Sequence, residues 1–286
     1  MKAGAFDYTR ATSLPEALAL LAEHGDDAKV LAGGQSLLPA LNLRLSTPAL
    51  LVDIGRLDEL RGIALQDGVL RLGALTRHAE LLTAPLVQAQ APLLARAIVH
   101  VAHPAVRSRG TLGGSLANAD PAAELPACVL ALQARLVLRS VRGERIVPAA
   151  AFFTGLFETA LAADEILTAV EIDGAGAGSV CGFQELSRRS GDYAIVGLAA
   201  QGQMQGGTLQ AIQLGYFSVG TRATLASAAG AALVRRPLDA TAIEAAAEAL
   251  ATDLTPHDDL QASAATRLHL ARVLLRRVVG EMADAA

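Results

Sequence analysis

Cysteine, aromatic residues and long apolar runs are all scarce in this chain of 286 residues. The chain has 2 cysteines, whereas an iron–sulfur cluster usually takes about four, so it cannot ligate such a cluster alone. Cys128 and Cys181 also lack a zinc-binding spacing and are too few for a disulfide-built secreted scaffold, so we expect both to fill apolar space. Tryptophan is absent and aromatic residues make up 3% of the chain, so aliphatic side chains must fill its cores.

Further absences limit where the chain acts and what it binds. It has no uncharged apolar stretch of about 18 residues that could span a membrane. Residues 1–8 lack the apolar run of a signal peptide. We therefore expect a cytoplasmic protein with no integral membrane segment, and we leave open a position at the inner face of the membrane. The formal net charge of −4 disfavours nucleic acid as a partner.

The familiar phosphate-binding and metal-binding motifs are missing too. No Gly-x-Gly-x-x-Gly follows a predicted strand, and no Walker A pattern is present. His78, His100 and His103 fall in one third of the chain, but their spacing is not that of a metal site, so we expect capping or core roles for them. Hydrophobic residues nevertheless make up 52% of the chain, which is enough to build two or three packed lobes.

Two glycine pairs with neighbouring hydroxyl groups stand out in what is present. The first glycine segment, Ala32-Gly33-Gly34-Gln35-Ser36, follows a short apolar run, and the second, Thr111-Leu112-Gly113-Gly114-Ser115, opens a polar stretch that continues to Glu124. We expect both to be loops in which the glycine amides and the hydroxyls of Ser36, Thr111 and Ser115 bind phosphate oxygens. Two such loops favour a long ligand. The alternative is that both are ordinary turns, which also need glycine.

The first 55 residues predict a small α/β lobe. Ser13-Leu14-Pro15-Glu16 combines a capping hydroxyl, an early proline and a glutamate three residues after the serine, which predicts a helix to about Glu23. Short apolar runs predict strands at 28–32 and 50–54, with a brief helix at 37–41 between them. Such alternation of strands and helices is typical of an α/β unit.

Residues 56–175 predict a second lobe that mixes strands with packed helices. Asp67-Gly68 indicates a hairpin between strands at 62–65 and 69–72. Thr76 is a candidate cap for a helix that ends near Leu82, and Pro92 should interrupt the helical stretch at 85–101. Beyond the second glycine segment we expect a helix at 125–134 and strands at 136–139, 145–147 and 165–172.

Residues 174–178 are rich in glycine and alanine and form the best candidate linker. After it, apolar runs predict strands at 179–186, 194–204 and 209–217, followed by helices at 239–251 and 263–282. The predicted fold class is therefore α+β, with a two-lobed domain at 1–175 (lobes 1–55 and 56–175) and a C-terminal domain of antiparallel strands and helices at 176–286.

Four motifs together resemble a known family. They are Ala32–Ser36, His103-Pro104-x-x-Arg107-x-Arg109-Gly110 continuing into the second glycine segment, Asp120-Pro121-Ala122-Ala123-Glu124-Leu125-Pro126, and Arg189-Ser190-Gly191-Asp192-Tyr193-Ala194-Ile195-Val196. In this order they closely resemble the FAD-binding medium subunit of molybdenum hydroxylases, and most of all the carbon monoxide dehydrogenase medium subunits. The resemblance covers essentially the whole chain. It implies a non-Rossmann FAD-binding domain at 1–175 and a C-terminal domain that contacts the flavin.

The resemblance also implies a non-covalent FAD site, carried over residue by residue. Both glycine segments would hold the pyrophosphate, Glu124 the ribityl or ribose region, Leu167 the adenine, and Tyr193 one face of the isoalloxazine. No catalytic side chain is expected, because the flavin carries the chemistry. The expected cofactor-binding residues are Ala32, Gly33, Gly34, Gln35, Ser36, Leu37, Thr111, Gly113, Gly114, Ser115, Asn118, Asp120, Glu124, Leu167, Gln184, Asp192 and Tyr193.

Two positions depart from the family pattern. Ser115 stands where many relatives have asparagine or aspartate, which changes one ligand group. Gln184 stands where xanthine-oxidising relatives have lysine. Because a nearby cation favours the anionic reduced flavin, the absence of that charge should lower the flavin potential.

In such enzymes a large subunit oxidises the substrate at a molybdenum cofactor, and 2Fe–2S clusters in a small subunit carry electrons to the FAD. The implied function is thus an electron-transfer subunit that passes electrons to an external acceptor, within a dimer of heterotrimers. Two alternatives remain, a stand-alone flavin oxidoreductase of the same fold and a non-catalytic assembly subunit without FAD. The sequence does not decide whether NAD, a quinone or oxygen is the acceptor, nor which substrate the partner oxidises.

Overall fold

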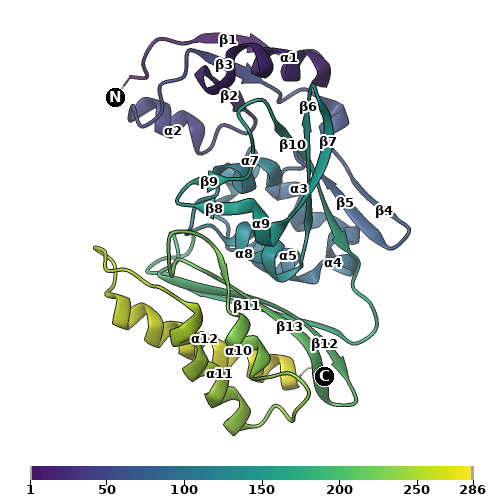
Figure 1. Ribbon diagram of the computed structural model, residues 1–286, viewed down its shortest axis with the longest axis vertical. Coiled ribbons are helices and arrows are strands. Elements are labelled where there is room, and N and C mark those ends of the chain that lie inside the picture. The colour runs from purple at the N-terminus through teal and green to yellow at the C-terminus, as the bar shows by residue number, and fades with distance from the viewer. Residues whose placement is uncertain (1, 285–286) are drawn as a thin grey trace.

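A computed structural model describes residues 2–284 and arranges them in three successive lobes, each built on its own sheet (Figure 1). Sheet orders are β1-β3-β2 in the N-terminal lobe, β4-β5-β10-β6-β7 in the middle lobe and β11-β12-β13-β14 in the C-terminal lobe. The first sheet is parallel and the other two are antiparallel. The predicted α+β fold class is confirmed.

The N-terminal lobe carries strands β1 (Asp7–Arg10), β2 (Ala28–Leu31) and β3 (Leu50–Asp53), with helices α1 (Leu14–His24) and α2 (Leu37–Asn42). The Ser13 hydroxyl accepts the N–H of Glu16, and so caps α1 as predicted. Leucines of α1 pack with Val52 in the core. The first glycine segment links β2 to α2 and lies at one end of the small sheet.

The middle lobe forms around a five-stranded sheet with helices packed against it. Its strands are β4 (Ile63–Gln66), β5 (Val69–Gly73), β6 (Arg135–Ser140), β7 (Gly143–Pro148) and β10 (Ile166–Asp173), with a small hairpin of β8 (Phe153–Gly155) and β9 (Glu158–Thr159). Its helices are α3 (His78–Thr83), α4 (Pro85–Gln90), α5 (Pro92–Ala97), α6 (Pro104–Arg107), α7 (Leu112–Asn118), α8 (Glu124–Ala131) and α9 (Ala149–Phe152).

Several local predictions for this lobe are confirmed and two are wrong. Asp67 and Gly68 both take positive φ in the β4–β5 turn, and a new helix begins at Pro92. Thr76 does not cap α3; its hydroxyl donates to the carbonyl of Gly62, while Arg77 is the N-cap residue. The second glycine segment is not a loop, because residues 112–118 form α7.

Helix α7 forms despite its two glycines. The Thr111 hydroxyl accepts the N–H of Gly114 at 3.1 Å, which satisfies one of the free donors of the first turn. Leu112 and Leu116 are fully buried in the core of the middle lobe. The helix ends at Ala119, whose φ of 47° is left-handed. Capping and leucine burial therefore outweigh the low helix propensity of glycine, about 1 kcal/mol per residue.

The C-terminal lobe is an antiparallel meander covered on one face by helices (Figure 1). It comprises β11 (Ser179–Leu186), β12 (Val196–Gln205), β13 (Thr208–Phe217), β14 (Thr224–Leu225), α10 (Ser227–Ala231), α11 (Ala240–Asp253) and α12 (Ala264–Asp284). Helix α8 of the middle lobe packs on the opposite face of this sheet and is buried along its whole length. Middle and C-terminal lobes thus share a continuous interface, and side chains at the start of α8 are enclosed there.

Candidate functional site

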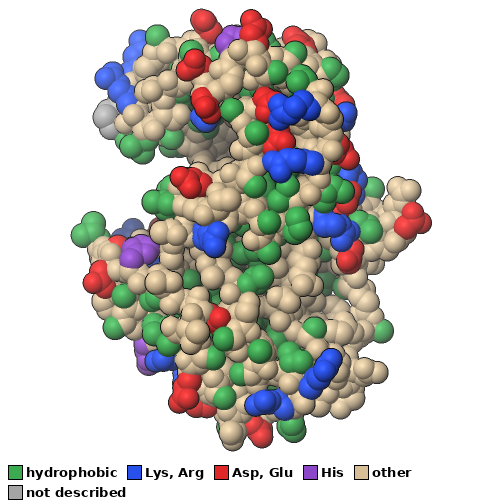
Figure 2. All heavy atoms as spheres, viewed as in Figure 1, with side chains coloured by type: hydrophobic (Ala, Val, Ile, Leu, Met, Phe, Trp, Pro, Cys, Tyr) green, Lys and Arg blue, Asp and Glu red, His purple; other side chains and the backbone are tan. Residues whose placement is uncertain are grey.

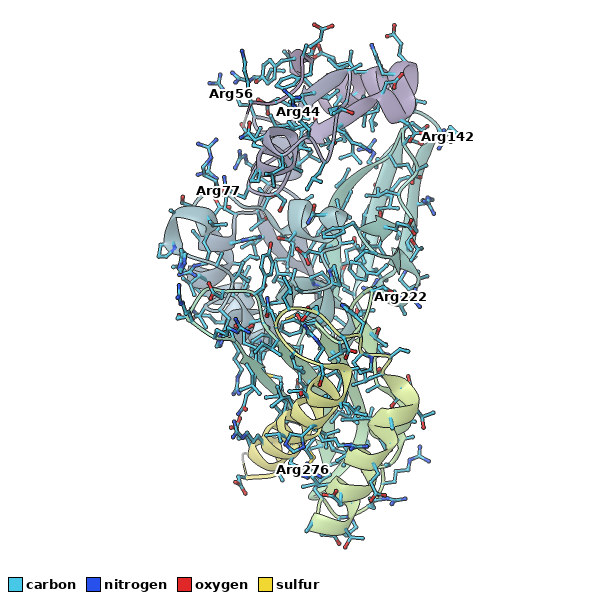
Figure 3. The ribbon with its side chains drawn as sticks, turned by 90° about the vertical axis from the view of Figure 1, so that its left-hand side faces the viewer. Arg44, Arg56, Arg77, Arg142, Arg222 and Arg276 are labelled. Atoms are coloured by element: carbon cyan, nitrogen blue, oxygen red, sulfur yellow. The ribbon has the colours of Figure 1, made fainter. Side chains whose placement is uncertain are left out.

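A cavity of about 520 Å³ lies between the N-terminal and middle lobes. Its wall includes both glycine segments, the start of α2, one face of α7, the start of β10 and the chain from Thr154 to Ala163. Figure 2 shows the surface hollowed beneath the N-terminal lobe. In the side view of Figure 3, Arg77 and Arg142 lie on opposite sides of the molecule. The cavity is large and mixed in polarity, as ligand sites usually are.

The two glycine segments touch each other, although they are far apart in the sequence. A Cβ atom at Gly33 would lie 2.2 Å from the carbonyl oxygen of Arg109, so this position admits no side chain. A Cβ at Gly114 would come to 4.0 Å from the Cβ of Ala32. Glycine at position 33 is thus required for close approach, and the two segments form one continuous wall.

The first glycine segment offers unused backbone donors. Among residues 2–284, no hydrogen bond within the chain uses the N–H of Gly33, Gly34, Gln35 or Ser36. Gly34 adopts a left-handed conformation with φ of 73°, which turns the chain sharply between β2 and α2. Consecutive free N–H groups in such a turn make a concave anion-binding surface.

In the second glycine segment the amides of residues 112–115 are all engaged within the chain. The N–H of Gly113 donates to the carbonyl of Ala74 at 2.8 Å, and that of Gly114 donates to the Thr111 hydroxyl. A Cβ at Gly113 would lie 2.5 Å from the Cβ of Ala74, so this glycine permits α7 to pack closely on the chain after β5. The expectation that both segments supply amide donors is therefore wrong for the second.

What the second segment exposes to the cavity is side-chain chemistry. Thr111, Ser115 and Asn118 all line the cavity. The Ser115 Oγ lies 3.2 Å from Nε2 of His78, which is 3% exposed. Burial, with the charge of Arg107 adding to it, lowers the pKa of His78 to about 4, so this histidine is neutral near pH 7.

Apolar side chains also line the cavity. Leu75, Ile166 and Leu167 line it from the middle lobe, and Phe157 lines it from the tip of the β8–β9 hairpin. Leu167 is the residue for which the resemblance implies an adenine contact, and it lines this cavity. Phe157 was missed from the sequence, because a hairpin of such short strands leaves no periodic signal.

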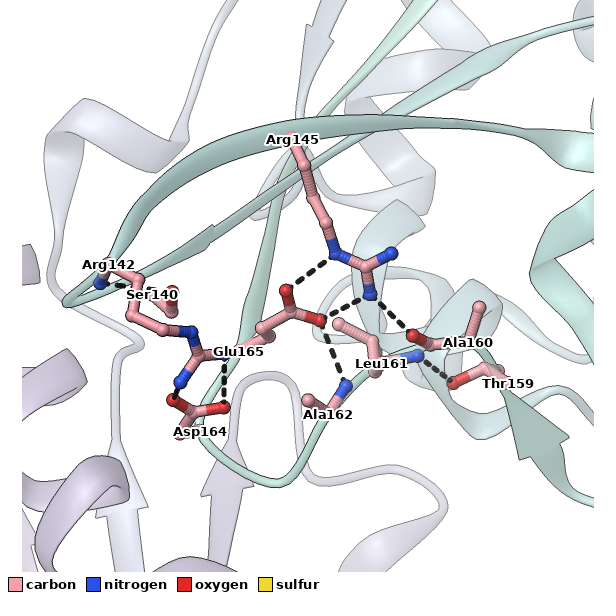
Figure 4. A network of polar contacts seen from close by, with 9 residues as sticks. All are labelled: Ser140, Arg142, Arg145, Thr159, Ala160, Leu161, Ala162, Asp164 and Glu165. Carbon is pink, nitrogen blue, oxygen red and sulfur yellow. Dashed lines mark hydrogen bonds and ion pairs between the residues drawn. The ribbon is translucent and has the colours of Figure 1, made fainter.

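An ion-pair network braces the segment 160–165, part of which lines the cavity (Figure 4). Arg145 forms a two-pronged pair with Glu165, with both N···O distances 2.7 Å, and donates to the carbonyl of Ala160 at 2.6 Å. Glu165 in turn accepts the N–H of Ala162 at 2.9 Å. Arg142 pairs with Asp164 beside it. Bidentate geometry of this kind fixes a loop more firmly than a single contact does.

Asp120 and Tyr193 lie elsewhere, at a second cavity of about 270 Å³ between the middle and C-terminal lobes. Tyr193 is 61% exposed. Partial desolvation of its hydroxyl, with the negative charge and hydrogen bond of Asp120, raises the pKa of Tyr193 to about 12. The phenol therefore stays protonated at neutral pH.

Three of the expected residues line neither cavity. Glu124, at the start of α8, is 8% exposed, and burial together with the carboxylate of Glu185 raises its pKa to about 7. Gln184 donates to Glu281 of α12 at 2.5 Å. Asp192 is exposed in a turn before β12.

The donor set fits a dinucleotide. The wall of the first cavity offers free amides and hydroxyls, which a pyrophosphate requires, together with aliphatic side chains, which an adenine requires. Within residues 2–284, no three histidine, cysteine or acidic side chains are grouped to hold a metal. No helix in that range is both long and apolar enough to cross a bilayer.

Comparison with known proteins identifies the two domain types in this chain. A family model described as the FAD binding domain in molybdopterin dehydrogenase matches residues 4–172, and one for the CO dehydrogenase flavoprotein C-terminal domain matches residues 182–282. Subunit alpha of the 6-hydroxypseudooxynicotine dehydrogenase complex from Paenarthrobacter nicotinovorans is 40% identical over 98% of this chain and 95% of its own.

Solved structures also match over the full length of the chain. Carbon monoxide dehydrogenase from Hydrogenophaga pseudoflava matches with a TM-score of 0.97 and 38% identity, over 100% of this chain and 99% of the other. Quinoline 2-oxidoreductase from Pseudomonas putida 86 matches with a TM-score of 0.94 and 41% identity, over the same shares. Identity at this level, together with a near-identical fold, identifies the family.

Proposed function

Because this chain belongs to the family of FAD-binding medium subunits of molybdopterin hydroxylases, we propose that it holds FAD and transfers electrons within such a complex. The bound flavin would supply the redox chemistry. The chain's own residues would bind and orient it, and none of them needs to act as a base or nucleophile.

The free amides of the first glycine segment carry this proposal. We place the pyrophosphate against the N–H groups of residues 33–36, where a dianion would satisfy donors that the protein leaves unpaired. The hydroxyls of Ser36, Thr111 and Ser115 would complete the set from the same wall. The other expected contacts from this wall, Ala32, Leu37, Gly113, Gly114 and Asn118, would shape the surface rather than donate amides.

The two ends of the ligand follow from this placement. The aliphatic side chains of the cavity wall, Leu167 among them, suit the adenine. The isoalloxazine would extend toward Asp120 and Tyr193, whose protonated phenol can lie against a ring without adding charge. We assign no direct contact to Glu124, Gln184 or Asp192, since they line neither cavity.

We further propose that electrons reach the flavin from 2Fe–2S clusters of a small subunit, after substrate oxidation at the molybdenum cofactor of a large subunit. The chain's 2 cysteines cannot provide such clusters, so separate chains must. A cytoplasmic dimer of heterotrimers and a division of this chain near residue 175 belong to the same proposal. The gap between the two family models, which match residues 4–172 and 182–282, supports that division.

A visible spectrum of the purified protein, alone and co-expressed with its partners, tests the function. We expect flavin absorbance, and FAD in the supernatant after acid precipitation. Flavin retained in the pellet would instead support a covalent flavin oxidoreductase. A colourless complex that contains both partner subunits would contradict the proposal and favour an assembly role without FAD.

A further inference from the structure

Ser115 contacts both the cavity and a buried histidine. It lines the cavity between the N-terminal and middle lobes, and its Oγ also lies 3.2 Å from Nε2 of His78. The two residues come from different helices, α7 and α3, which the Arg77–Thr111 bridge holds side by side. A serine hydroxyl has one hydrogen to donate. If the imidazole donates to the Ser115 Oγ, that hydrogen can be donated to a ligand; if the imidazole accepts it, it cannot.

The His78 side chain is closely packed by its neighbours. Its backbone N–H donates to the carbonyl of Gly110 at 3.0 Å, and its ring is buried at the first turn of α3. A Cβ atom at Gly110 would lie 2.9 Å from Nδ1 of this ring, so glycine is needed there for the ring to fit. Burial and the close approach of Gly110 therefore hold the imidazole in place.

The surroundings of the two ring nitrogens select a tautomer. Nδ1 is buried and has no hydrogen-bond partner among residues 2–284, whereas Nε2 faces Ser115. In a neutral imidazole one nitrogen carries the hydrogen. A buried N–H without an acceptor is rarer and more costly than a buried acceptor without a donor. The hydrogen therefore belongs on Nε2, which lies in reach of the Ser115 Oγ and is also favoured by a hydrogen bond to the backbone of Thr111.

We propose that His78 is a positioning residue, which occupies a lone pair of Ser115 and thereby directs the serine hydroxyl hydrogen to a pyrophosphate oxygen of the bound dinucleotide. This inference rests on the proposed function and deepens it. It gives the second glycine segment a donor of its own, although its amides are engaged within the chain. An N–H···O–H···phosphate chain also strengthens each bond by polarisation.

The tautomer can be measured without the cofactor. In the full-length chain with ¹⁵N-labelled histidine, two-bond nitrogen–proton correlations at pH 7 distinguish the two neutral forms. The His78 signals are assigned by their loss in His78→Gln, with the exposed His269→Gln as the matched control. We expect a protonated Nε2 and an unprotonated Nδ1. A hydrogen on Nδ1 would overturn the inference, because Ser115 would then have to donate to the ring.

FAD affinity, followed by flavin fluorescence, tests the consequence. A hydrogen bond to a charged group contributes about 1.5–3 kcal/mol, so Ser115→Ala and His78→Phe should each weaken binding at least about tenfold. The double variant should be no weaker than Ser115→Ala, and His78→Gln, which keeps a donor, should recover most of the loss. Fully additive losses, or no loss in Ser115→Ala, would overturn the inference.

The two proposals fail in different ways. A wild-type chain that binds no FAD, alone or with its partners, overturns the proposed function and this inference with it. A wild-type chain that binds FAD, but whose Ser115→Ala variant binds it equally well, overturns this inference alone. If His78→Phe does not fold, Ser115→Ala and the tautomer measurement still decide the matter.

Discussion

In the first glycine segment the chain turns without using its own amides, whereas in the second the N–H groups of residues 112–115 all donate to acceptors within the protein. Both segments have two adjacent glycines followed by a polar residue. In the first segment a short helix, α2, begins after that residue. The difference comes from what precedes each pair. Thr111 caps a helix that starts at once, while Ala32 leaves a strand and leads into an open turn.

This comparison separates two uses of glycine. At Gly33 and Gly113 the missing side chain permits close packing, against Arg109 and Ala74 respectively. At Gly34 the glycine permits a left-handed turn that presents free donors. A glycine pair in a sequence therefore indicates a close approach or a turn, and only the hydrogen bonds around it show whether it can bind an anion.

The largest effects on stability should come from substitution of Gly33 and Gly113, the glycines that permit close packing. Gly33→Ala and Gly113→Ala would each force a Cβ to within 2.5 Å of its neighbours, so we expect each to lower the unfolding free energy by about 3 kcal/mol or more. Urea unfolding followed by circular dichroism measures the change. Gly176→Ala, where a Cβ meets nothing within 4 Å, is the matched control. An equal loss in the control would refute this packing role.

The next largest effect should be a loss of stability at acid pH. It involves only the second glycine segment, because the buried His78 contacts Ser115 of that segment. Burial lowers the pKa of His78 to about 4, so between pH 6.5 and 4 the unfolded chain binds its proton first. This contribution to stability is complete above pH 6.5 and should fall by up to about 3 kcal/mol as the pH drops to 4. The unfolding free energy of His78→Gln should lose this part of its pH dependence; an unchanged profile would contradict the shift.

The turn glycine should affect binding more than folding. Gly34→Ala and Gly68→Ala both place alanine at positive φ, at 73° and 79°, and each should cost about 1–2 kcal/mol of stability. Gly34→Ala should be the costlier, because its Cβ would lie 3.1 Å from the Leu38 side chain. Only Gly34 lies at the cavity, so only its variant should weaken FAD binding, by about tenfold or more. Titration of both variants with FAD gives the comparison. A similar loss of affinity in Gly68→Ala would remove the special role of the first segment.

The smallest expected effects on stability come from the hydroxyls of Thr111 and Ser36. Thr111→Val removes a helix cap and should cost about 1 kcal/mol of unfolding free energy besides weakening FAD binding. Ser36 makes no side-chain capping bond to α2, so Ser36→Ala should leave stability within about 0.5 kcal/mol while still weakening FAD binding. Thermal unfolding with and without FAD separates the two effects. Equal stability losses would show that the two hydroxyls do not differ as described.

Local chemistry carried most of the fold prediction. The Ser13 cap, the Asp67-Gly68 turn and the helix start at Pro92 each have a short-range cause that the sequence displays directly. Helix α7 was missed because its glycines disfavour a helix locally, while the burial of its leucines depends on the rest of the lobe. Where the local helix propensity was weak, tertiary packing determined the secondary structure.

For the candidate site too, features with a local sequence signal were predicted, and features that depend on tertiary contacts were not. Both glycine segments and Leu167 were predicted and line one cavity. The contact between His78 and Ser115 was not predicted, because it joins residues 37 positions apart in the sequence. The free or engaged state of each amide was equally inaccessible, since it depends on acceptors such as Ala74 that only the folded chain brings into place.

Hydrogen exchange of individual backbone amides, in the chain with and without FAD, tests the central claim most directly. Without FAD, the amides of Gly33 and Gly34 should exchange rapidly and those of Gly113 and Gly114 slowly, because only the latter donate within the protein. FAD should then protect Gly33 and Gly34 and change Gly113 and Gly114 little. Strong new protection confined to the second segment would contradict the account, since the pyrophosphate would then be bound by amides that we describe as engaged.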